Sequence, residues 1–199
     1  MNPLTPNHDS PTQLRAFLDS KELGMRKKYG QNFLVNADIR NKLLDALEIK
    51  PGQKVWEIGP GLGAMTKGLL EKNALVTAFE IDPAFSILLR ELFNEYKNFT
   101  LIEGDVLKTW PGVQESGELF LLGNLPYNIA ATLLANFIEK KRFFKRIVVT
   151  VQRETAQRMI AKPGTKDYSS FTVLCSSVYK ITPLFIIKSS SFYPVPKVE

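Results

Sequence analysis

Short apolar runs alternate with amphipathic stretches along most of this chain, and the alternation restricts its fold more than any other feature. The apolar runs predict strands at residues 54–58, 75–81, 99–103, 119–123 and 146–152. Helices are predicted at residues 64–73, 83–96, 129–140, 153–161 and 169–179. Strands that alternate with helices form right-handed βαβ units, so we expect an α/β fold with a parallel sheet and helices on both faces.

The two ends of the chain add elements to this core. Residues 1–9 are predicted to be a tail, and Ser10 followed by Pro11 predicts the start of a helix that ends near Gly24. A further helix is expected over residues 37–47. Near the C-terminus, residues 181–187 and 192–198 are predicted to pair as a closing hairpin. We therefore divide the chain into a tail and helix (1–24) and a main domain (25–199).

Two residue types are nearly missing, and their scarcity excludes several kinds of active site. Cys175 is the only cysteine and His8 the only histidine among the 199 residues. An intramolecular disulfide and a cysteine-rich metal site are therefore excluded, and a histidine triad or histidine metal cluster is not expected. Cys175 lies in an apolar segment and is predicted to be a small core residue. We expect no metal, so any catalysis must use carboxylates, amides and a bound cofactor.

Positive charge is concentrated in residues 140–166. That segment holds nine Lys and Arg residues against one acid, Glu154, a local charge of +8 in a chain whose net charge is +6. Such a run can be a solvated face, but an excess of this size is typical of a protein that binds a polyanion. Neither this run nor Arg26-Lys27-Lys28 lies on a clear lipid-facing helix, so nucleic acid is favoured over a membrane. The predicted RNA contacts are Lys27, Lys28, Lys140, Lys141, Arg142 and Lys145.

Three glycines follow the first predicted strand, in the segment Glu57-Ile58-Gly59-Pro60-Gly61-Leu62-Gly63. Glycine lets the backbone approach a ligand closely, and the next helix offers free N–H groups at its N-terminus. The spacing is Gly-x-Gly-x-Gly, whereas a dinucleotide pyrophosphate is bound by Gly-x-Gly-x-x-Gly. The loop therefore favours S-adenosylmethionine, which has no phosphate, over the alternative of a nicotinamide dinucleotide.

Polar residues end the next three predicted strands. Glu80 stands 21 residues after Gly59, where a carboxylate can accept both ribose hydroxyls, and Asp105 can accept from the amine of the cofactor's adenine. The strand at 119–123 ends in Asn124. Each acid alone could be an ordinary surface residue. Because parallel strands end at one edge of a sheet, the glycine loop, the two acids and Asn124 are expected to share a crevice.

The segment Asn124-Leu125-Pro126-Tyr127 suits methylation of an adenine amine, whose lone pair is delocalised into the purine ring. The Asn124 side-chain oxygen and the carbonyl of Leu125 or Pro126 can accept the two amine hydrogens and localise that lone pair. Tyr127 can stack on a flipped base. An ordinary strand-to-helix turn is the alternative, because these residue types are common there.

Four segments together resemble the ribosomal RNA small-subunit adenine dimethyltransferases: residues 27–34 (Lys-Lys-Tyr-Gly-Gln-Asn-Phe-Leu), 57–63, 124–127 and 192–198 (Phe-Tyr-Pro-Val-Pro-Lys-Val). The resemblance implies a Rossmann-like class I S-adenosylmethionine-dependent methyltransferase fold, with a seven-stranded, mostly parallel sheet whose last strand is antiparallel. The expected cofactor-binding residues are Asn32, Leu34, Gly59, Gly61, Glu80, Asp105 and Asn124. The expected catalytic residues are Asn124, Leu125, Pro126, Tyr127 and Phe192, the last as a second aromatic wall for the base.

The implied function is dimethylation of two adjacent adenosines in 16S rRNA of the 30S particle, with S-adenosylhomocysteine as the product and a cytoplasmic monomer as the enzyme. Tyr29 departs from the Ser or Thr that the family commonly carries. The family also continues into a small helical C-terminal domain, so residues 25–199 are expected to be the catalytic domain of a truncated chain. The alternatives are a 23S rRNA methyltransferase that confers macrolide resistance and a non-catalytic nucleic-acid-binding relative. The Gly30–Leu34 segment and the preceding lysines favour the small-subunit enzyme.

Overall fold

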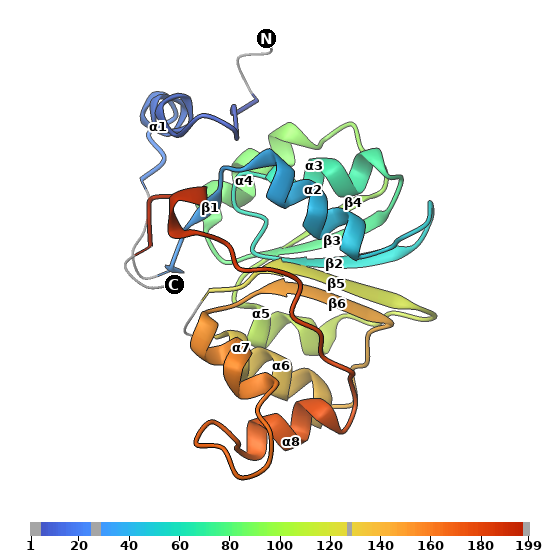
Figure 1. Ribbon diagram of the computed structural model, residues 1–199. Helices are drawn as coiled ribbons and strands as arrows, with labels where there is room; N and C mark the ends of the chain where they lie inside the picture. The colour runs from blue at the N-terminus through green and yellow to red at the C-terminus, as the bar shows by residue number, and fades with distance from the viewer. Residues whose placement is uncertain (1–4, 25–28, 127–128, 197–199) are drawn as a thin grey trace.

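A computed structural model describes residues 5–24, 29–126 and 129–196 of the chain, and these form an α/β fold (Figure 1). The main sheet is parallel, with strand order β4-β3-β2-β5-β6. Every predicted strand of this sheet forms, with its ends shifted by two residues at most. Their bounds are β2 (Lys54–Ile58), β3 (Leu75–Glu80), β4 (Phe99–Glu103), β5 (Leu119–Asn124) and β6 (Arg146–Thr150).

Helices cover both faces of the sheet, as the alternation predicts (Figure 1). On one face lie α2 (Ala37–Ala46), α3 (Ala64–Glu71) and α4 (Pro83–Leu92). On the other lie α5 (Val106–Thr109), α6 (Ala130–Glu139), α7 (Arg153–Met159) and α8 (Ser170–Ser176), with a short 3-10 turn at Trp110–Gly112. The side chains of adjacent strand residues point to opposite faces of the sheet. Val55 packs with the helices α2–α4, and Trp56 packs with the helices of the other face. Apolar burial on both faces explains the continuous apolar runs of the strands.

Helix α1 (Pro11–Ser20) packs against this domain beside the glycine loop. The Ser10 hydroxyl accepts a hydrogen bond from the Gln13 backbone N–H at 3.3 Å, which confirms the predicted helix start. The helix ends at Ser20, before the predicted end near Gly24. Its buried residues Leu14 and Leu18 join the apolar cluster that contains Leu62 of the glycine loop.

The predicted closing hairpin is wrong. Residues 181–187 form no strand, and β7 (Phe192–Tyr193) pairs antiparallel with β1 (Phe33–Leu34) after a 3-10 turn at Ser189–Ser191. Pro183 has no N–H to donate to a ladder, and β1 lies too far along the chain for a local pattern to reveal it as the partner. The seven strands of the described residues therefore divide into five parallel strands and a separate antiparallel pair.

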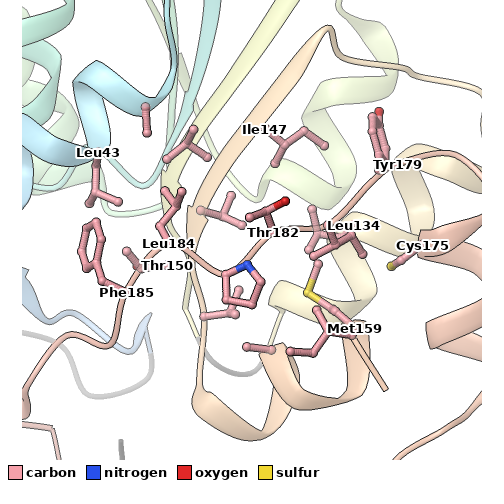
Figure 2. A pocket seen from close by; sticks show the side chains of 18 of the residues that line it. Leu43, Leu134, Ile147, Thr150, Met159, Cys175, Tyr179, Thr182, Leu184 and Phe185 are labelled. Carbon is pink, nitrogen blue, oxygen red and sulfur yellow. The ribbon is translucent and has the colours of Figure 1, made fainter. Parts of the chain in front are cut away.

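An apolar groove of about 770 Å³ separates β6 from the extended residues 180–187 (Figure 2). Leu43 of α2, Leu134 of α6 and Cys175 of α8 line it together with Leu184 and Phe185 of the extended segment. Cys175 is buried in the core, as predicted, and its burial raises the pKa of the thiol to about 11. Within the part of the chain that the structure describes, no helix has the length and apolar character needed to cross a membrane.

Candidate cofactor and adenine site

The glycine loop turns sharply between β2 and α3. Gly59, Gly61 and Gly63 all have positive φ, at 69°, 57° and 82°, a region that other residues adopt only with strain. A Cβ at Gly61 would lie 3.1 Å from a ring carbon of Phe33, the first residue of β1. The loop and the Phe33 segment therefore approach each other closely, and glycine is required at this contact.

Glu80 ends β3 directly beneath this loop. Its carboxylate accepts hydrogen bonds from the backbone N–H groups of Gly61, at 3.0 Å, and Asp82, at 2.8 Å. Burial raises the pKa of the Glu80 carboxyl to about 7, although these two N–H donors oppose the shift. A carboxylate has about four acceptor positions, so two more remain for hydroxyl groups of a ligand.

Two further acids lie at the same edge of the sheet. Asp82 is fully buried, accepts from the Ala84 N–H at 3.1 Å to cap α4, and accepts from Gln31 Nε2 at 2.8 Å. It ties the segment before β1 to β3, a role that the sequence analysis missed. Asp105 follows β4, the strand beside β3, and caps α5 by accepting from the Leu107 N–H at 3.0 Å.

Asn124, the last residue of β5, joins two segments that are distant in sequence. Its Nδ2 donates to the Asn32 carbonyl oxygen at 2.7 Å, and its Oδ1 accepts from the Thr150 hydroxyl of β6. The structure therefore brings together the predicted residues Asn32 and Asn124. A side chain at the preceding Gly123 would place its Cβ 2.8 Å from the Leu125 side chain, so this turn has no room for one.

The other predicted residues of the adenine site lie close by. Leu34 pairs with Phe192 across the β1–β7 ladder, and both are buried in the core, with 5% and 9% of their surface exposed. Phe192 also lines the groove of Figure 2, together with Asn124. Leu125 is a core residue, whereas Pro126 lines a hollow beside the glycine loop. Tyr127, predicted to stack on the base, lies outside the described residues, as do Lys27 and Lys28.

A hollow of about 90 Å³ lies between the glycine loop, Glu80 and Asn124. Ligand pockets usually measure at least about 300 Å³, so this hollow is small for a ligand. His8 and Arg40 also line the hollow, although the sequence analysis assigned neither to it. Their side chains come from the N-terminal segment and from α2.

Arg40 links the N-terminal segment to β1, beside the hollow. Its buried guanidinium donates to the Leu34 carbonyl oxygen at 2.7 Å and forms an ion pair with Asp9. Burial, followed by the charge of Arg40, lowers the pKa of His8 to about 4, so His8 is neutral at pH 7. The sequence contains a weak signal for this arrangement: a charged residue on the apolar side of the 37–47 helix.

The described residues among the predicted RNA contacts lie away from this hollow. Lys140, Lys141 and Arg142 follow the C-terminus of α6, and Lys145 directly precedes β6, so all four lie at the amino-terminal end of the sheet. Asn124 lies about one strand length away, roughly 16 Å for five residues. Arg153 begins α7 just beyond the carboxyl end of β6 and lines the groove together with Asn124.

The glycine loop, the buried Glu80 carboxylate and the Asn124 amide thus lie together at the carboxyl ends of parallel strands, where Rossmann-like folds bind their ligands. The chain belongs to the ribosomal RNA adenine dimethylase family, whose model matches residues 23–199. Ribosomal RNA small subunit methyltransferase A of Treponema denticola is 48% identical over 198 residues, which cover 98% of this chain and 68% of that protein. The protein of the same name from Borreliella afzelii is 47% identical and covers 97% and 68% of the two chains.

Solved structures agree with this assignment. The dimethyladenosine transferase from Plasmodium falciparum has a TM-score of 0.73 at 34% identity, covering 82% of this chain and 58% of that chain. The 23S rRNA methyltransferase ErmE has a TM-score of 0.67 at 26% identity, covering 83% and 65%. The predicted family and the class I methyltransferase fold are thus confirmed.

Proposed function

We propose that this chain transfers methyl groups from S-adenosylmethionine to the N6 amines of two adjacent adenosines in small-subunit rRNA of the 30S particle. The observation that carries the proposal is the position of Asn124. Its amide is held by Asn32 at the cofactor hollow, and the same residue lines the groove beside Phe192. One side chain thus faces both a cofactor site and a space for a base. The small-subunit names of the similar bacterial proteins support the choice of substrate.

The residues around the hollow fit the cofactor. Gly61 leaves the space that a Cβ would fill, and Glu80 keeps acceptor positions for the ribose hydroxyls. Asn32 and Leu34, which line the hollow, would contact its methionine end, and Asp105, which caps α5 outside that lining, would accept from the adenine amine. When bound, S-adenosylmethionine supplies an electrophilic methyl group. The protein supplies position and hydrogen-bond acceptors, and forms no covalent intermediate.

Asn124 and the turn that follows prepare the target amine. The Asn124 oxygen and the carbonyl of Leu125 or Pro126 accept the two amine hydrogens, which localises the nitrogen lone pair and directs it at the methyl group. Tyr127 and Phe192 hold the base between them. The methylated nitrogen then releases one proton to solvent. Since the first product keeps one amine hydrogen, it can bind again and accept a second methyl group.

The proposal extends to the whole chain. Residues 25–199 form the catalytic unit, and residues 1–24 are a separate N-terminal part, whose helix α1 packs on that unit through Leu14 and Leu18. The enzyme acts as a cytoplasmic monomer. Light scattering on the purified chain, alone and with S-adenosylhomocysteine, tests this oligomeric state, and a dimer mass would contradict it.

The proposed substrate is tested with ribosomal particles that lack the modification. The purified chain is incubated with labelled S-adenosylmethionine and unmethylated 30S particles, 50S particles or duplex DNA, and modified nucleosides are identified by mass spectrometry. Dimethyladenosine in two adjacent positions of 16S rRNA is the expected product. Label confined to 50S RNA would assign the chain to the large-subunit methyltransferases. Cofactor binding without transfer to any of these substrates would identify a non-catalytic relative.

A further inference from the structure

Thr150 contacts the Asn124 turn at two points. It is the last residue of β6 and stands opposite Asn124 in the β5–β6 ladder. Its hydroxyl donates a hydrogen bond to Asn124 Oδ1, and its backbone carbonyl accepts from the Leu125 N–H at 3.2 Å. Figure 2 shows Thr150 on the wall of the groove that Asn124 and Phe192 also line. The site residues expected from the sequence did not include it.

The hydrogen bonds of Asn124 determine which way its amide faces. The Asn32 carbonyl can only accept, so the group that faces it at 2.7 Å must be the amide nitrogen. The amide oxygen therefore faces Thr150, whose hydroxyl can donate to it. A flipped amide would present N–H donors where the target amine, itself a donor, must be held. Such a flip removes the acceptor on which transfer depends.

We propose that Thr150 is a positioning residue for methyl transfer: its hydroxyl holds the Asn124 oxygen in place as an acceptor for the target amine. This inference rests on the proposed function and deepens it at one atom. The Asn124 oxygen has two acceptor positions, so one bond to Thr150 leaves the second for an amine hydrogen. Thr150 touches neither substrate nor cofactor in this role and acts through Asn124.

The second methylation depends on Thr150 more than the first. An unmethylated amine has two hydrogens, which the Asn124 oxygen and a backbone carbonyl of the turn can accept together. A monomethylated amine has one hydrogen left, and when the Asn124 oxygen accepts it, no second hydrogen bond at the same nitrogen can offset a misplaced oxygen. Loss of the Thr150 hydroxyl should therefore slow the second transfer more than the first.

The test compares Thr150→Val, which removes the hydroxyl, with Thr150→Ser, which keeps it. Thr100→Val is the matched control, because Thr100 is an exposed strand residue of β4 at the far edge of the sheet. Each variant is assayed on unmethylated 30S particles, and monomethyladenosine and dimethyladenosine are quantified separately. Calorimetric titration with S-adenosylhomocysteine and thermal unfolding are measured on the same preparations.

Thr150→Val should lower kcat for the first transfer by about tenfold, in line with the loss of a supporting hydrogen bond behind a reacting group. It should also raise the ratio of monomethyl to dimethyl product. KM for RNA and the affinity for S-adenosylhomocysteine should stay within twofold of wild type. Thr150→Ser should recover most of the activity, and Thr100→Val should match wild type.

Three results would overturn the inference while leaving the proposed function intact. In the first, the wild type is active and Thr150→Val has the same methyl-transfer activity. In the second, Thr150→Val and Thr150→Ser lose activity equally. In the third, unfolding or weaker cofactor binding accounts for the whole loss of activity in Thr150→Val. Failure of the wild type itself to methylate 30S particles would instead contradict the proposed function.

Discussion

Among the described residues, several polar groups at the two ends of the parallel sheet are held in different ways. At the amino-terminal end, charges are paired with each other: Lys54 Nζ lies 2.9 Å from a Glu115 oxygen, and Arg146 Nη1 lies 2.6 Å from a Glu48 oxygen. At the carboxyl end, Glu80 is buried and held by backbone N–H groups. An ion pair at the surface is neutralised and adds little stability, whereas a buried carboxylate with spare acceptor positions can receive a ligand.

The contrast shows why charge density alone is a poor guide to the reactive site. The densest basic stretch of the chain starts at the amino-terminal end of the sheet. There Lys145 pairs with Glu118 at 2.9 Å, and the Arg142 guanidinium lies 5.3 Å from the Trp56 ring centre. The groups proposed for chemistry are amides, backbone carbonyls and buried acids at the other end. Parallel strands gather them there because every strand of the sheet ends on the same side.

The largest effect is expected from Asn124→Ala. Loss of the acceptor oxygen should lower kcat by about a hundredfold or more, since removing one hydrogen bond to a reacting group has that effect in other enzymes. S-adenosylhomocysteine should still bind within several-fold of wild type. Asn41→Ala, at an exposed position on α2, is the matched control and should retain full activity. Equal activity in both variants would remove Asn124 from the mechanism.

Glu80→Gln should weaken cofactor binding by about tenfold or more. Its amide nitrogen would face the N–H groups of Gly61 or Asp82, which need an acceptor, and would leave one of them unsatisfied. In the wild type, the carboxyl pKa of about 7 predicts that affinity falls as the pH drops from 8 to 6, because the protonated form accepts fewer hydrogen bonds. Calorimetric titrations with S-adenosylhomocysteine across this range measure both effects.

The stability of the ligand-free protein should fall as the pH rises, whereas its affinity for the cofactor should increase. Burial raises the pKa values of Glu80 and of the neighbouring Glu57, each to about 7, above their unfolded values near 4.5. The folded state therefore holds more protons between pH 4.5 and 7, and the free energy of unfolding falls as the pH rises through that window. A ligand-free protein that gains stability over the same range, with no pH dependence of binding, would contradict the raised pKa values.

Asp9→Asn tests whether the N-terminal segment belongs to the cofactor side. The change removes the charge that pairs with Arg40 and so loosens the link between this segment and the Leu34 carbonyl. We expect cofactor affinity to fall about threefold, the modest effect of a partly exposed ion pair. Asp19→Asn removes the exposed Arg15–Asp19 pair on the same segment and is the matched control. If both variants bind equally well, the hollow does not depend on the segment.

The smallest change is expected in the salt dependence of RNA binding. Lys140→Ala with Lys141→Ala removes two of the predicted phosphate contacts at the amino-terminal end, whereas Arg153→Gln removes one charge from the groove that Asn124 also lines. Each lost contact should lower the slope of log affinity against log salt by about one unit. A slope unchanged in the double variant but reduced in Arg153→Gln would confine the RNA surface to the carboxyl end of the sheet.

The sequence predicted the elements that are determined by residues close together in the chain. The five parallel strands are continuous apolar runs, and the glycine loop, Glu80, Asp105 and Asn124 follow strand ends that such runs reveal. The β1–β7 pair was missed because Leu34 meets Phe192 only through a distant contact. Arg40 was missed for the same reason, since its partner Asp9 lies in another segment. Thr150 did carry a signal: it is a polar residue at a strand end, as Glu80 and Asn124 are.

Two hollows among the described residues allow the most direct test of this account. The hollow beside Asn124 measures about 90 Å³ and is lined by glycines and an acid, whereas the apolar groove beside β6 measures about 770 Å³. The decisive measurement is a crystal structure of the chain with S-adenosylhomocysteine. The account predicts an opened glycine-loop site, with the ribose on Glu80 and the sulfur facing Asn124. Ligand bound only in the groove between β6 and residues 180–187, with the glycine-loop site empty, would contradict it.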